Sequence, residues 1–389
     1  MNQVRYGIIG MGNQGSSYLY GIFEKGLVEG AVVTAVCDIN PDKLTTVKEK
    51  TKFADLVYFE NYIDLLDSGL VDAVLVETPH YDHPTIVIEA LKRGIHALCD
   101  KPAGVYTKQV REMNEVAEGA NALFGMMFNQ RTNHIYRKMK ELIAEGAIGQ
   151  LQRVSWIITD WYRTQFYYDS GNWRATWAGE GGGVLINQCP HQIDLLSWIT
   201  GVQPSAVRGF CQYGRWHDIE VEDEVTAYLE YDCGATGTLI TTTGETPGTN
   251  RLEISGTKGK LLAEGGILQY FRNDQDTYTH TVTAQNGFSR PKCDIIQVET
   301  DGENPQHQGI LQNFTNAILG TETLFATGVS GINGVDLMNA IELSGWLDGA
   351  RVPLPVDEDL YLAELNKRRA TSRLKTGTDL AATSTEGTY

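Results

Sequence analysis

Residues 4–23, VRYGIIGMGNQGSSYLYGIF, constrain the fold more than any other part of the chain. A short β-branched run is followed by Gly10, Gly12 and Gly15 in G-x-G-x-x-G spacing, and then by helical periodicity. In this context the first glycine allows a tight turn, the second lets the backbone approach a pyrophosphate, and the third permits close packing of helix on strand. The helix N-terminus attracts the anion. The segment therefore predicts a dinucleotide-binding βαβ unit.

A second predicted strand, AVVTAVCD, ends in Asp38, 23 residues after Gly15. A carboxylate at this place accepts hydrogen bonds from the adenosine ribose hydroxyls and repels the 2′-phosphate of NADP at close range. We therefore predict that the cofactor is NAD. The alternative, that Asp38 only caps the helix in DINPDKL, leaves the three glycines unexplained.

Helical and strand-like segments then alternate through residue 102, which is typical of a doubly wound parallel sheet. Thr78 and Pro79 follow one predicted strand, and Asp100, Lys101 and Pro102 follow the next. Ligands of such sheets bind at these carboxyl ends. His80 and His83 lie in the loop after Thr78, where exposed loop residues are the favoured interpretation.

Lys101 is a candidate for the chemistry itself. A lysine beside the nicotinamide ring can hydrogen-bond a substrate hydroxyl, and desolvation can lower its pKa into a useful range. A solvated lysine at a strand end fits the local sequence at least as well.

Length and charge exclude several classes of protein. A chain of 389 residues is too long for one ordinary core, and we expect two domains. The net charge of −17 argues against a nucleic-acid or anionic-membrane partner, and no apolar run is long enough to cross a bilayer. Six cysteines without a C-x-x-C pair indicate neither a zinc site nor a disulfide framework. The N-terminus enters a strand-like run directly, so we expect a cytoplasmic protein without a signal peptide.

The segment GGGVLINQCPHQIDLL, residues 181–196, reads as a glycine-rich turn that runs into an amphipathic helix. Helical spacing would put His191 and Asp194 on one face, with Asn187 one turn before His191. We interpret His191 as the group that takes the proton from a substrate hydroxyl. A buried histidine with satisfied hydrogen bonds is the competing interpretation.

The preceding segment, residues 161–179, holds seven aromatic side chains together with Arg163 and Arg174. Aromatic faces beside polar groups suit a sugar ring, so Trp161 and Trp173 are candidates for a substrate wall. An aromatic cluster in the core or at an interface is about as consistent with the pattern as a substrate wall is. Further on, residues 225–266 alternate like antiparallel strands with one wet face, and residues 275–303 indicate a long loop over the site or an interface.

The order and spacing of these segments resemble the glucose-fructose oxidoreductase and inositol dehydrogenase family, often called Gfo/Idh/MocA. The similarity runs through GIIGMGNQG, CDINPDK, VDAVLVETPHYDH, ALKRGIHALCDKP, MMFNQRTNH, GAIGQLQ, GGGVLINQCPHQIDLL, ISGTKGKL and HQGILQNFTNAILG. The resemblance implies an α/β protein with an N-terminal Rossmann doubly wound parallel sheet and a C-terminal α+β domain built on a large, mostly antiparallel sheet. One face of that sheet carries the substrate site, and the other is often an oligomer interface.

We place the NAD-binding Rossmann domain at residues 1–128, the substrate-binding and oligomerisation domain at 129–355, and a C-terminal tail at 356–389. The tail carries a basic cluster between Lys367 and Lys375 and then small polar residues, so we expect disorder or docking on a neighbouring subunit.

The resemblance assigns the active-site lysine to Lys101 and the catalytic histidine to His191, and the bond before Pro102 is often cis in the family. The family's D-x-G-x-H-x-x-D pattern falls on residues 187–194, but Asn187 stands where aspartate is usual and Cys189 where glycine is usual. A neutral amide can orient an imidazole without stabilising the imidazolium, so we expect His191 to be a weaker base here. Asp194 is a further candidate for orienting the ring.

The resulting candidate site has three groups of residues and no metal. The catalytic group is Lys101, His191 and Asn187. The cofactor-binding group is Gly10, Gly12, Asn13, Gln14, Gly15, Asp38, Thr78, Pro79, His83, Asp100, Lys101 and Asn129. The substrate-binding group is Lys101, Asn129, Arg131, Trp161, Arg163, Trp173, Arg174, Asn187, His191 and His307.

We expect an NAD-dependent oxidoreductase that oxidises a secondary hydroxyl of a sugar, glycoside or cyclic polyol, with the pyranose 3-position as the finer expectation. The expected partner is a copy of the same chain, in a dimer to hexamer. One alternative is a redox-neutral enzyme that uses bound NAD for transient oxidation during glycoside cleavage or epimerisation. Another is a non-catalytic sensor of cofactor or sugar, although such regulators would be expected to lose Lys101 and His191.

Overall fold

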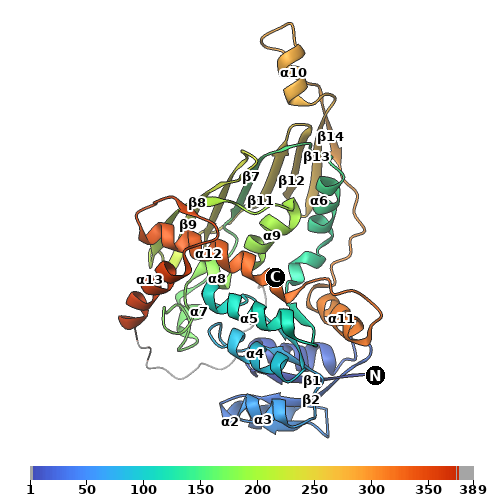
Figure 1. Ribbon diagram of the computed structural model, residues 1–389, viewed down its shortest axis with the longest axis vertical. Coiled ribbons are helices and arrows are strands. Elements are labelled where there is room, and N and C mark those ends of the chain that lie inside the picture. Colours follow the sequence, from blue (N-terminus) through green and yellow to red (C-terminus); the bar gives the residue numbers. More distant parts are fainter. Residues whose placement is uncertain (1–2, 374, 376–389) are drawn as a thin grey trace.

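A computed structural model describes residues 3–373 and 375 and contains two sheets (Figure 1). The first is a six-stranded sheet in the order β3-β2-β1-β4-β5-β6, and all of its pairings are parallel. Its strands are β1 (Val4–Ile9), β2 (Ala31–Cys37), β3 (Val57–Phe59), β4 (Ala73–Val76), β5 (His96–Cys99) and β6 (Phe124–Met126). This order confirms the predicted doubly wound sheet, and its switch point lies between β1 and β4.

Helices cover both faces of this sheet, as a parallel sheet buried on two sides requires. They are α1 (Asn13–Ser17), which continues into the π-helical turn η1 (Tyr18–Phe23), and α2 (Pro41–Lys50), α3 (Tyr62–Asp67), α4 (His83–Lys92) and α5 (Thr107–Gly119). Strand β4 reads AVLV and is buried throughout. Such an unbroken apolar run is what a central parallel strand needs.

The second sheet has nine strands in the order β14-β13-β12-β11-β7-β10-β9-β8-β15. Among the described strands, β10 and β7 pair in parallel and the other neighbours pair antiparallel. The strands are β7 (Leu151–Ile158), β8 (Ala206–Tyr213), β9 (Glu222–Glu230), β10 (Thr236–Thr242), β11 (Asn250–Gly256), β12 (Gly259–Glu264), β13 (Ile267–Asn273), β14 (Cys293–Gln297) and β15 (Val352–Pro353).

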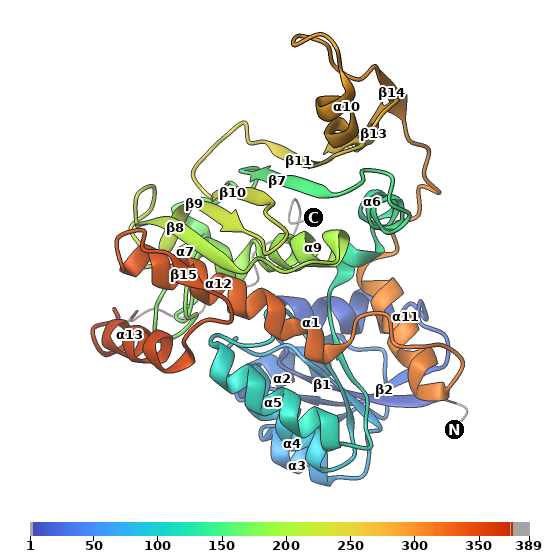
Figure 2. The same ribbon diagram turned by 45° about the horizontal axis from the view of Figure 1, so that its top comes forward.

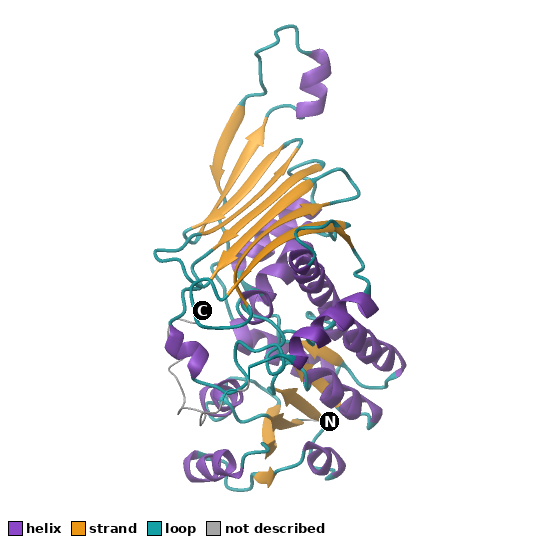
Figure 3. Cartoon of the chain, turned by 90° about the vertical axis from the view of Figure 1, so that its left-hand side faces the viewer, coloured by secondary structure: helices purple, strands orange, loops and turns teal. Residues whose placement is uncertain are grey.

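Helices pack on one face of the nine-stranded sheet (Figure 3). In β9 the buried residues Val225, Ala227 and Leu229 alternate with the exposed Thr226 and Tyr228. The covering helices are α8 (Val184–Asn187), α9 (Pro190–Thr200) and α12 (Gly331–Trp346), and α6 (His134–Ala144) packs against α9. The period-2 alternation therefore identified correctly a sheet with one covered and one wet face.

The chain returns to the nucleotide-binding half after residue 305. Helix α11 (Gln306–Leu319) packs against β1, and Tyr6 shares a 2.8 Å hydrogen bond with Thr315. An isolated bridge also pairs Gly125 with Thr327. Figure 2 shows α11 beside α1. Sequence order alone put this helix in the substrate half.

Two segments differ from expectation. Residues 274–299 include the short helix α10 (Thr277–Thr283) and strand β14, and Figure 1 shows them projecting at the far end from the Rossmann sheet, so they do not form a loop over the site. Residues 358–370 form helix α13, whose Tyr361 and Leu365 are buried against the same chain. The expected disorder is thus wrong for α13, while residues 376–389 lie outside the described range. Across that range, no helix has the length and apolar character needed to cross a membrane.

Candidate active site

The glycine-rich loop after β1 has the geometry that a dinucleotide needs. Gly10 has φ +101°, and a Cβ there would lie 2.5 Å from the Glu77 carbonyl oxygen. A Cβ at Gly15 would lie 2.0 Å from the carbonyl oxygen of Gly10. Apart from its neighbours in the chain, no described residue lies within 4 Å of the place that a Cβ would take at Gly12. The first and third glycines are thus required by the turn, and the second leaves the backbone open to a pyrophosphate.

Asp38 stands at the carboxyl end of β2, beside this loop. Its carboxylate accepts hydrogen bonds from the backbone N–H groups of Met11 at 2.8 Å and Asn40 at 2.9 Å. Helix α2 is capped by Asn40 instead, whose side chain accepts from Asp42 N, so the capping interpretation of Asp38 is wrong. A carboxylate has about four acceptor positions, and Asp38 keeps capacity for the ribose hydroxyls.

The two histidines after β4 are buried, and the interpretation as exposed loop residues is wrong. The ring nitrogens of His83 lie 2.8 Å from the carbonyl oxygens of Thr78 and Pro102. His80 Nδ1 lies 3.2 Å from the carbonyl oxygen of Glu180. His83 therefore joins the two strand-end loops to each other, and its contact with the cofactor stays a prediction. Pro79 is exposed beside them.

Two buried acceptors point to a further polar ligand in this region. Within the described part of the chain, neither Thr78 Oγ1 nor Asn129 Oδ1 has a hydrogen-bond partner. Buried polar atoms without partners are costly, and a bound polar molecule satisfies them. Together with the glycine loop and Asp38, they fit a nicotinamide dinucleotide.

Lys101 follows β5, and its bond to Pro102 is cis. Its Nζ donates a 2.8 Å hydrogen bond to the backbone carbonyl oxygen of Asn187, across the boundary between the two halves. Burial lowers the pKa of Lys101, and Arg174 and Arg163 add to the effect, while Asp100 and Glu180 oppose it. The structure thus supports the desolvated interpretation of Lys101 over the solvated one.

His191 lies in the first turn of α9 and is buried. Burial lowers the pKa of His191 well below its usual value, and the charges of Lys101 and His307 act in the same direction. Its Nδ1 has no hydrogen-bond partner among the described residues. The ring is therefore a neutral, unsatisfied group, and the interpretation as a satisfied core histidine is wrong.

Asn187 does not orient His191, which corrects its predicted role. Helix α8 ends at Asn187, and Pro190 begins α9, so the two residues do not share one continuous helix. The Asn187 amide group instead donates to Glu180 through Nδ2 and accepts from the Tyr167 hydroxyl at 3.1 Å. Its contribution to the site is the backbone carbonyl that binds Lys101.

Glu180 is the site residue that sequence reasoning missed. Its carboxylate accepts from Asn187 Nδ2 and from the backbone N–H of Ala175 at 2.5 Å, and the side chain is 2% exposed. Burial raises the pKa of Glu180, and Arg174 opposes this. A single acidic residue directly before three glycines was the available signal, since the stretch around it is otherwise apolar or small.

Arg131 and Asp194 form a buried ion pair, with the guanidinium 2.6 and 2.8 Å from the two carboxylate oxygens. Arg131 also lies over the Phe128 ring at 4.5 Å. The predicted role of Asp194 in orienting His191 is therefore wrong, because both of its carboxylate oxygens bind Arg131. The role of Arg131 in substrate binding stays a prediction. Asn129 lies close by and donates to Gln306 at 2.6 Å.

The aromatic segment divides into a core part and a wall. Trp177 is buried and packs against Trp346, and the Tyr168 hydroxyl donates to Thr243 at 2.7 Å, so both serve the core. Trp161, Tyr167 and Trp173 are partly exposed. The guanidinium of Arg174 lies 4.6 Å from the rings of both Tyr167 and Trp173, and that of Arg163 lies 5.7 Å from Trp161 and 5.3 Å from Tyr167.

His307 opens α11, as predicted, and faces the same region. Its ring centroid is 5.6 Å from that of Tyr18. Burial lowers the pKa of His307 to about 4; the Asp100 charge opposes this and the Lys101 charge adds to it. The His307 imidazole is therefore neutral at physiological pH. It is better suited to line the substrate site than to act there as a second charged group.

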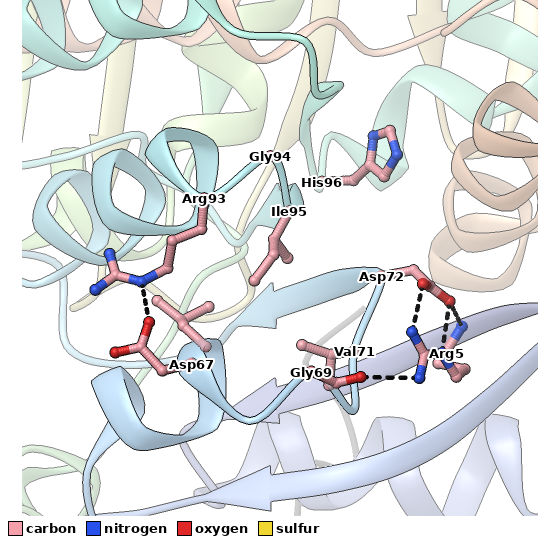
Figure 4. Close-up of a pocket in the computed structure, with 10 residues that line it drawn as sticks. Arg5, Asp67, Gly69, Val71, Asp72, Arg93, Gly94, Ile95 and His96 are labelled. Atoms are coloured by element: carbon pink, nitrogen blue, oxygen red, sulfur yellow. Dashed lines mark hydrogen bonds and ion pairs between the residues drawn. The ribbon is translucent and has the colours of Figure 1, made fainter.

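A cavity of about 490 Å³ lies elsewhere, at the amino ends of β1, β4 and β5 (Figure 4). Its charged side chains are already paired, with Arg5 2.8 Å from Asp72 and Arg93 2.7 Å from Asp67. Because ligands of doubly wound sheets bind at the carboxyl ends, this cavity is at the wrong edge for the cofactor.

Comparison with known proteins gives a consistent result. Residues 4–128 match the sequence model described as "Oxidoreductase family, NAD-binding Rossmann fold", and residues 136–262 match the "GFO/IDH/MocA C-terminal domain". Rhizopine catabolism protein MocA of Rhizobium meliloti is 27% identical over 54% of this chain and 61% of its own length. Myo-inositol 2-dehydrogenase of Thermotoga maritima is 25% identical over 67% of this chain and 75% of its own.

Solved structures also match. The WlbA dehydrogenase of Bordetella pertussis, crystallised with NADH and UDP-GlcNAcA, superposes with a TM-score of 0.74 at 26% identity, and the match covers 91% of this chain and 100% of that one.

Proposed function

Because the chain belongs to the GFO/IDH/MocA family of NAD-binding oxidoreductases, we propose that it oxidises a secondary hydroxyl of a sugar, glycoside or cyclic polyol. The observation that carries the proposal is that Lys101 Nζ binds the backbone carbonyl of Asn187, four residues before His191, and that its charge acts on the His191 ring. Lys101 and His191 both have a lowered pKa, and burial is the largest cause for each.

The two side chains have complementary roles in the proposed reaction. The ammonium group of Lys101 donates a hydrogen bond to the reacting hydroxyl oxygen and stabilises the negative charge that develops there. His191, held neutral, accepts the hydroxyl proton. NAD, when bound, supplies the acceptor for the hydride from the carbinol carbon.

A cyclic substrate suits the wall beside these groups. Trp161, Tyr167 and Trp173 offer partly exposed rings, and Arg163 and Arg174 stand among them. Aromatic faces and polar tips bind the C–H faces and hydroxyl rims of sugar rings. The names of the relatives, an inositol dehydrogenase among them, support the same class. The pyranose 3-position, a cytoplasmic location and a homo-oligomeric state stay predictions.

A screen of pyranosides and inositols with NAD, followed by absorbance of NADH and by analysis of the sugar, tests the proposal. On the best substrate, Lys101→Ala and His191→Ala should each slow the chemical step by about 10²–10⁴-fold. His191→Ala, which lies outside the predicted cofactor-binding group, should leave NAD affinity nearly unchanged. Turnover retained in either variant would remove that residue from the mechanism.

A further inference from the structure

The amide of Asn187 is held from both sides by named partners. Its Nδ2 donates to Glu180, and its Oδ1 accepts from the Tyr167 hydroxyl at 3.1 Å and from Gln188 Nε2 at 3.2 Å. The Tyr167 hydroxyl accepts in turn from Arg174 at 2.8 Å. The backbone carbonyl of the same asparagine accepts from Lys101 Nζ. Glu180 is therefore the carboxylate at the end of a chain of hydrogen bonds that includes the residue bound to Lys101.

The backbone around Glu180 is bent in a way that places this carboxylate. Ala175 donates its N–H to the carboxylate while adopting φ +53°, a conformation that non-glycine residues rarely adopt. Gly181 follows with φ +90°, and a Cβ there would lie 2.3 Å from Val105. Strained residues persist where the surrounding structure holds them, and they concentrate at functional sites.

We propose that Glu180 supplies the carboxylate of this active site in place of the neutral residue at 187, as a positioning residue that fixes Asn187 and stabilises the ammonium form of Lys101. This inference rests on the proposed function. It adds the residue that supplies the negative charge near Lys101. Removal of the charge should make Lys101 easier to deprotonate, because a nearby anion favours the charged form of a lysine.

Charged and titratable groups surround Lys101 from every element packed against it. These groups are Asp100 on its own loop, Glu77 and His80 after β4, Arg163, Arg174 and Glu180 from the segment before α8, Cys189 and His191 at the start of α9, and His307 from α11. Burial lowers the pKa of Lys101, and Asp100 and Glu180 are the acidic groups that oppose it. Of these two, Glu180 is the one joined to Asn187.

Hydrogen-bond accounting predicts how exchanged side chains behave. Ala175 N–H and Asn187 Nδ2 bind different oxygens of the Glu180 carboxylate. In Glu180→Gln an NH2 group replaces one of these oxygens and faces one of the two donors, which loses its acceptor. In Asn187→Asp, two carboxylates face each other. In the double variant, the amide at position 180 can accept from Ala175 and donate to the carboxylate at position 187. Both side chains then have their hydrogen-bond partners. The negative charge has moved from position 180 to position 187.

The test is the pH dependence of kcat/KM for the wild type, both single variants and the double variant. We expect Glu180→Gln to lower kcat/KM and to move the alkaline limb to lower pH by on the order of one unit. Asn187→Asp should also lower kcat/KM. The double variant should restore both the value of kcat/KM and the pH at which its alkaline limb lies in the wild type. Asp218→Asn, which removes one exposed carboxylate, is the matched control and should leave the limb in place.

A second readout does not need turnover. The rate at which acetic anhydride labels Lys101 in the NAD-bound enzyme, followed against pH by mass spectrometry, reports its deprotonation directly. A shift to lower pH in Glu180→Gln that the double variant reverses supports the proposal, even if no sugar in the screen is oxidised. An unchanged Lys101 titration in a folded Glu180→Gln enzyme, or a double variant no better than the single ones, would overturn it.

Discussion

Lys101 and His191 occupy one buried site in which neither side chain keeps its ordinary proton affinity. Burial is the first cause for both, because removing a charged group from water favours its neutral form. For His191 this yields a base that is neutral at physiological pH. For Lys101 it yields an ammonium group that loses its proton at a lower pH than an exposed lysine does.

These shifts predict a pH profile. The acidic limb of kcat/KM should lie below pH 6.5, because the pKa of His191 is lowered from that value, and the alkaline limb should lie below pH 10.5, because the pKa of Lys101 is lowered from there. Steady-state rates from pH 4.5 to 10 check this. An acidic limb above pH 6.5 would show that the base is not a desolvated His191.

Asp38 makes a second prediction at the scale of one residue. Asp38→Ala removes the acceptor for Met11 N–H and for the ribose hydroxyls, so NAD should bind about 10–100-fold more weakly. The ratio of kcat/KM for NAD to kcat/KM for NADP should fall. Lys43→Ala, which removes the cation 3.5 Å from the same carboxylate, is the control and should keep the preference. Wild-type enzyme with a higher kcat/KM for NADP than for NAD would contradict the assignment.

Single residues were predicted best where one spacing has one physical explanation. The three glycines are such a case, because the tight turn and the close backbone approach are both local requirements, and the structure has both. Asn187 is the opposite case, because its partner depends on a break in the helix between residues 187 and 190. Glu180 needed the fold, since a carboxylate becomes functional only through the groups that it contacts.

At the scale of elements, strands and helices with a clear period were predictable, and their contacts were not. Helix α9 is buried on nearly all sides, so its residues do not show which neighbour each one faces. The buried pair of Arg131 and Asp194, which are 63 positions apart in the sequence, joins the 3-10 turn η2 (Asn129–Thr132) to α9. Periodicity carries no information about such a pair.

That pair predicts a stability effect separate from chemistry. Arg131→Met leaves Asp194 buried without a partner and should cost about 3–5 kcal/mol of unfolding free energy, measured by urea denaturation. The double variant Arg131→Met with Asp194→Leu removes both charges and should recover much of the loss. An Arg131→Met enzyme of unchanged stability but with a greatly raised KM for the sugar would contradict this structural role. It would indicate that Arg131 binds the substrate.

At the scale of the whole molecule, the second half of the chain completes the first. Helix α11 covers β1, and the end of the described chain returns to the aromatic segment. There Glu220 accepts from the backbone N–H of Trp177 and from that of Arg373, both at 2.7 Å, and Lys375 donates to the Tyr168 carbonyl at 2.8 Å. Long-range returns of this kind leave no local pattern in a sequence.

The return predicts a measurable coupling. Glu220→Ala removes the acceptor shared by the aromatic segment and the chain end, so trypsin should cleave after Arg373 about tenfold faster under native conditions. Glu224→Ala, which breaks an exposed pair with Arg215 2.9 Å away, is the matched control. Equal cleavage rates in the two variants would show that the chain end is not held by Glu220.

The proposed activity is the oxidation of a sugar or polyol hydroxyl with net transfer of hydride to NAD. It is tested most directly by incubating the enzyme with excess NAD and a panel of pyranosides and inositols, and by quantifying NADH and ketosugar in the same samples. We expect equal amounts of NADH and ketosugar with at least one substrate, and loss of both in Lys101→Ala. A sugar that is cleaved or epimerised without net NADH would contradict it and identify a redox-neutral enzyme.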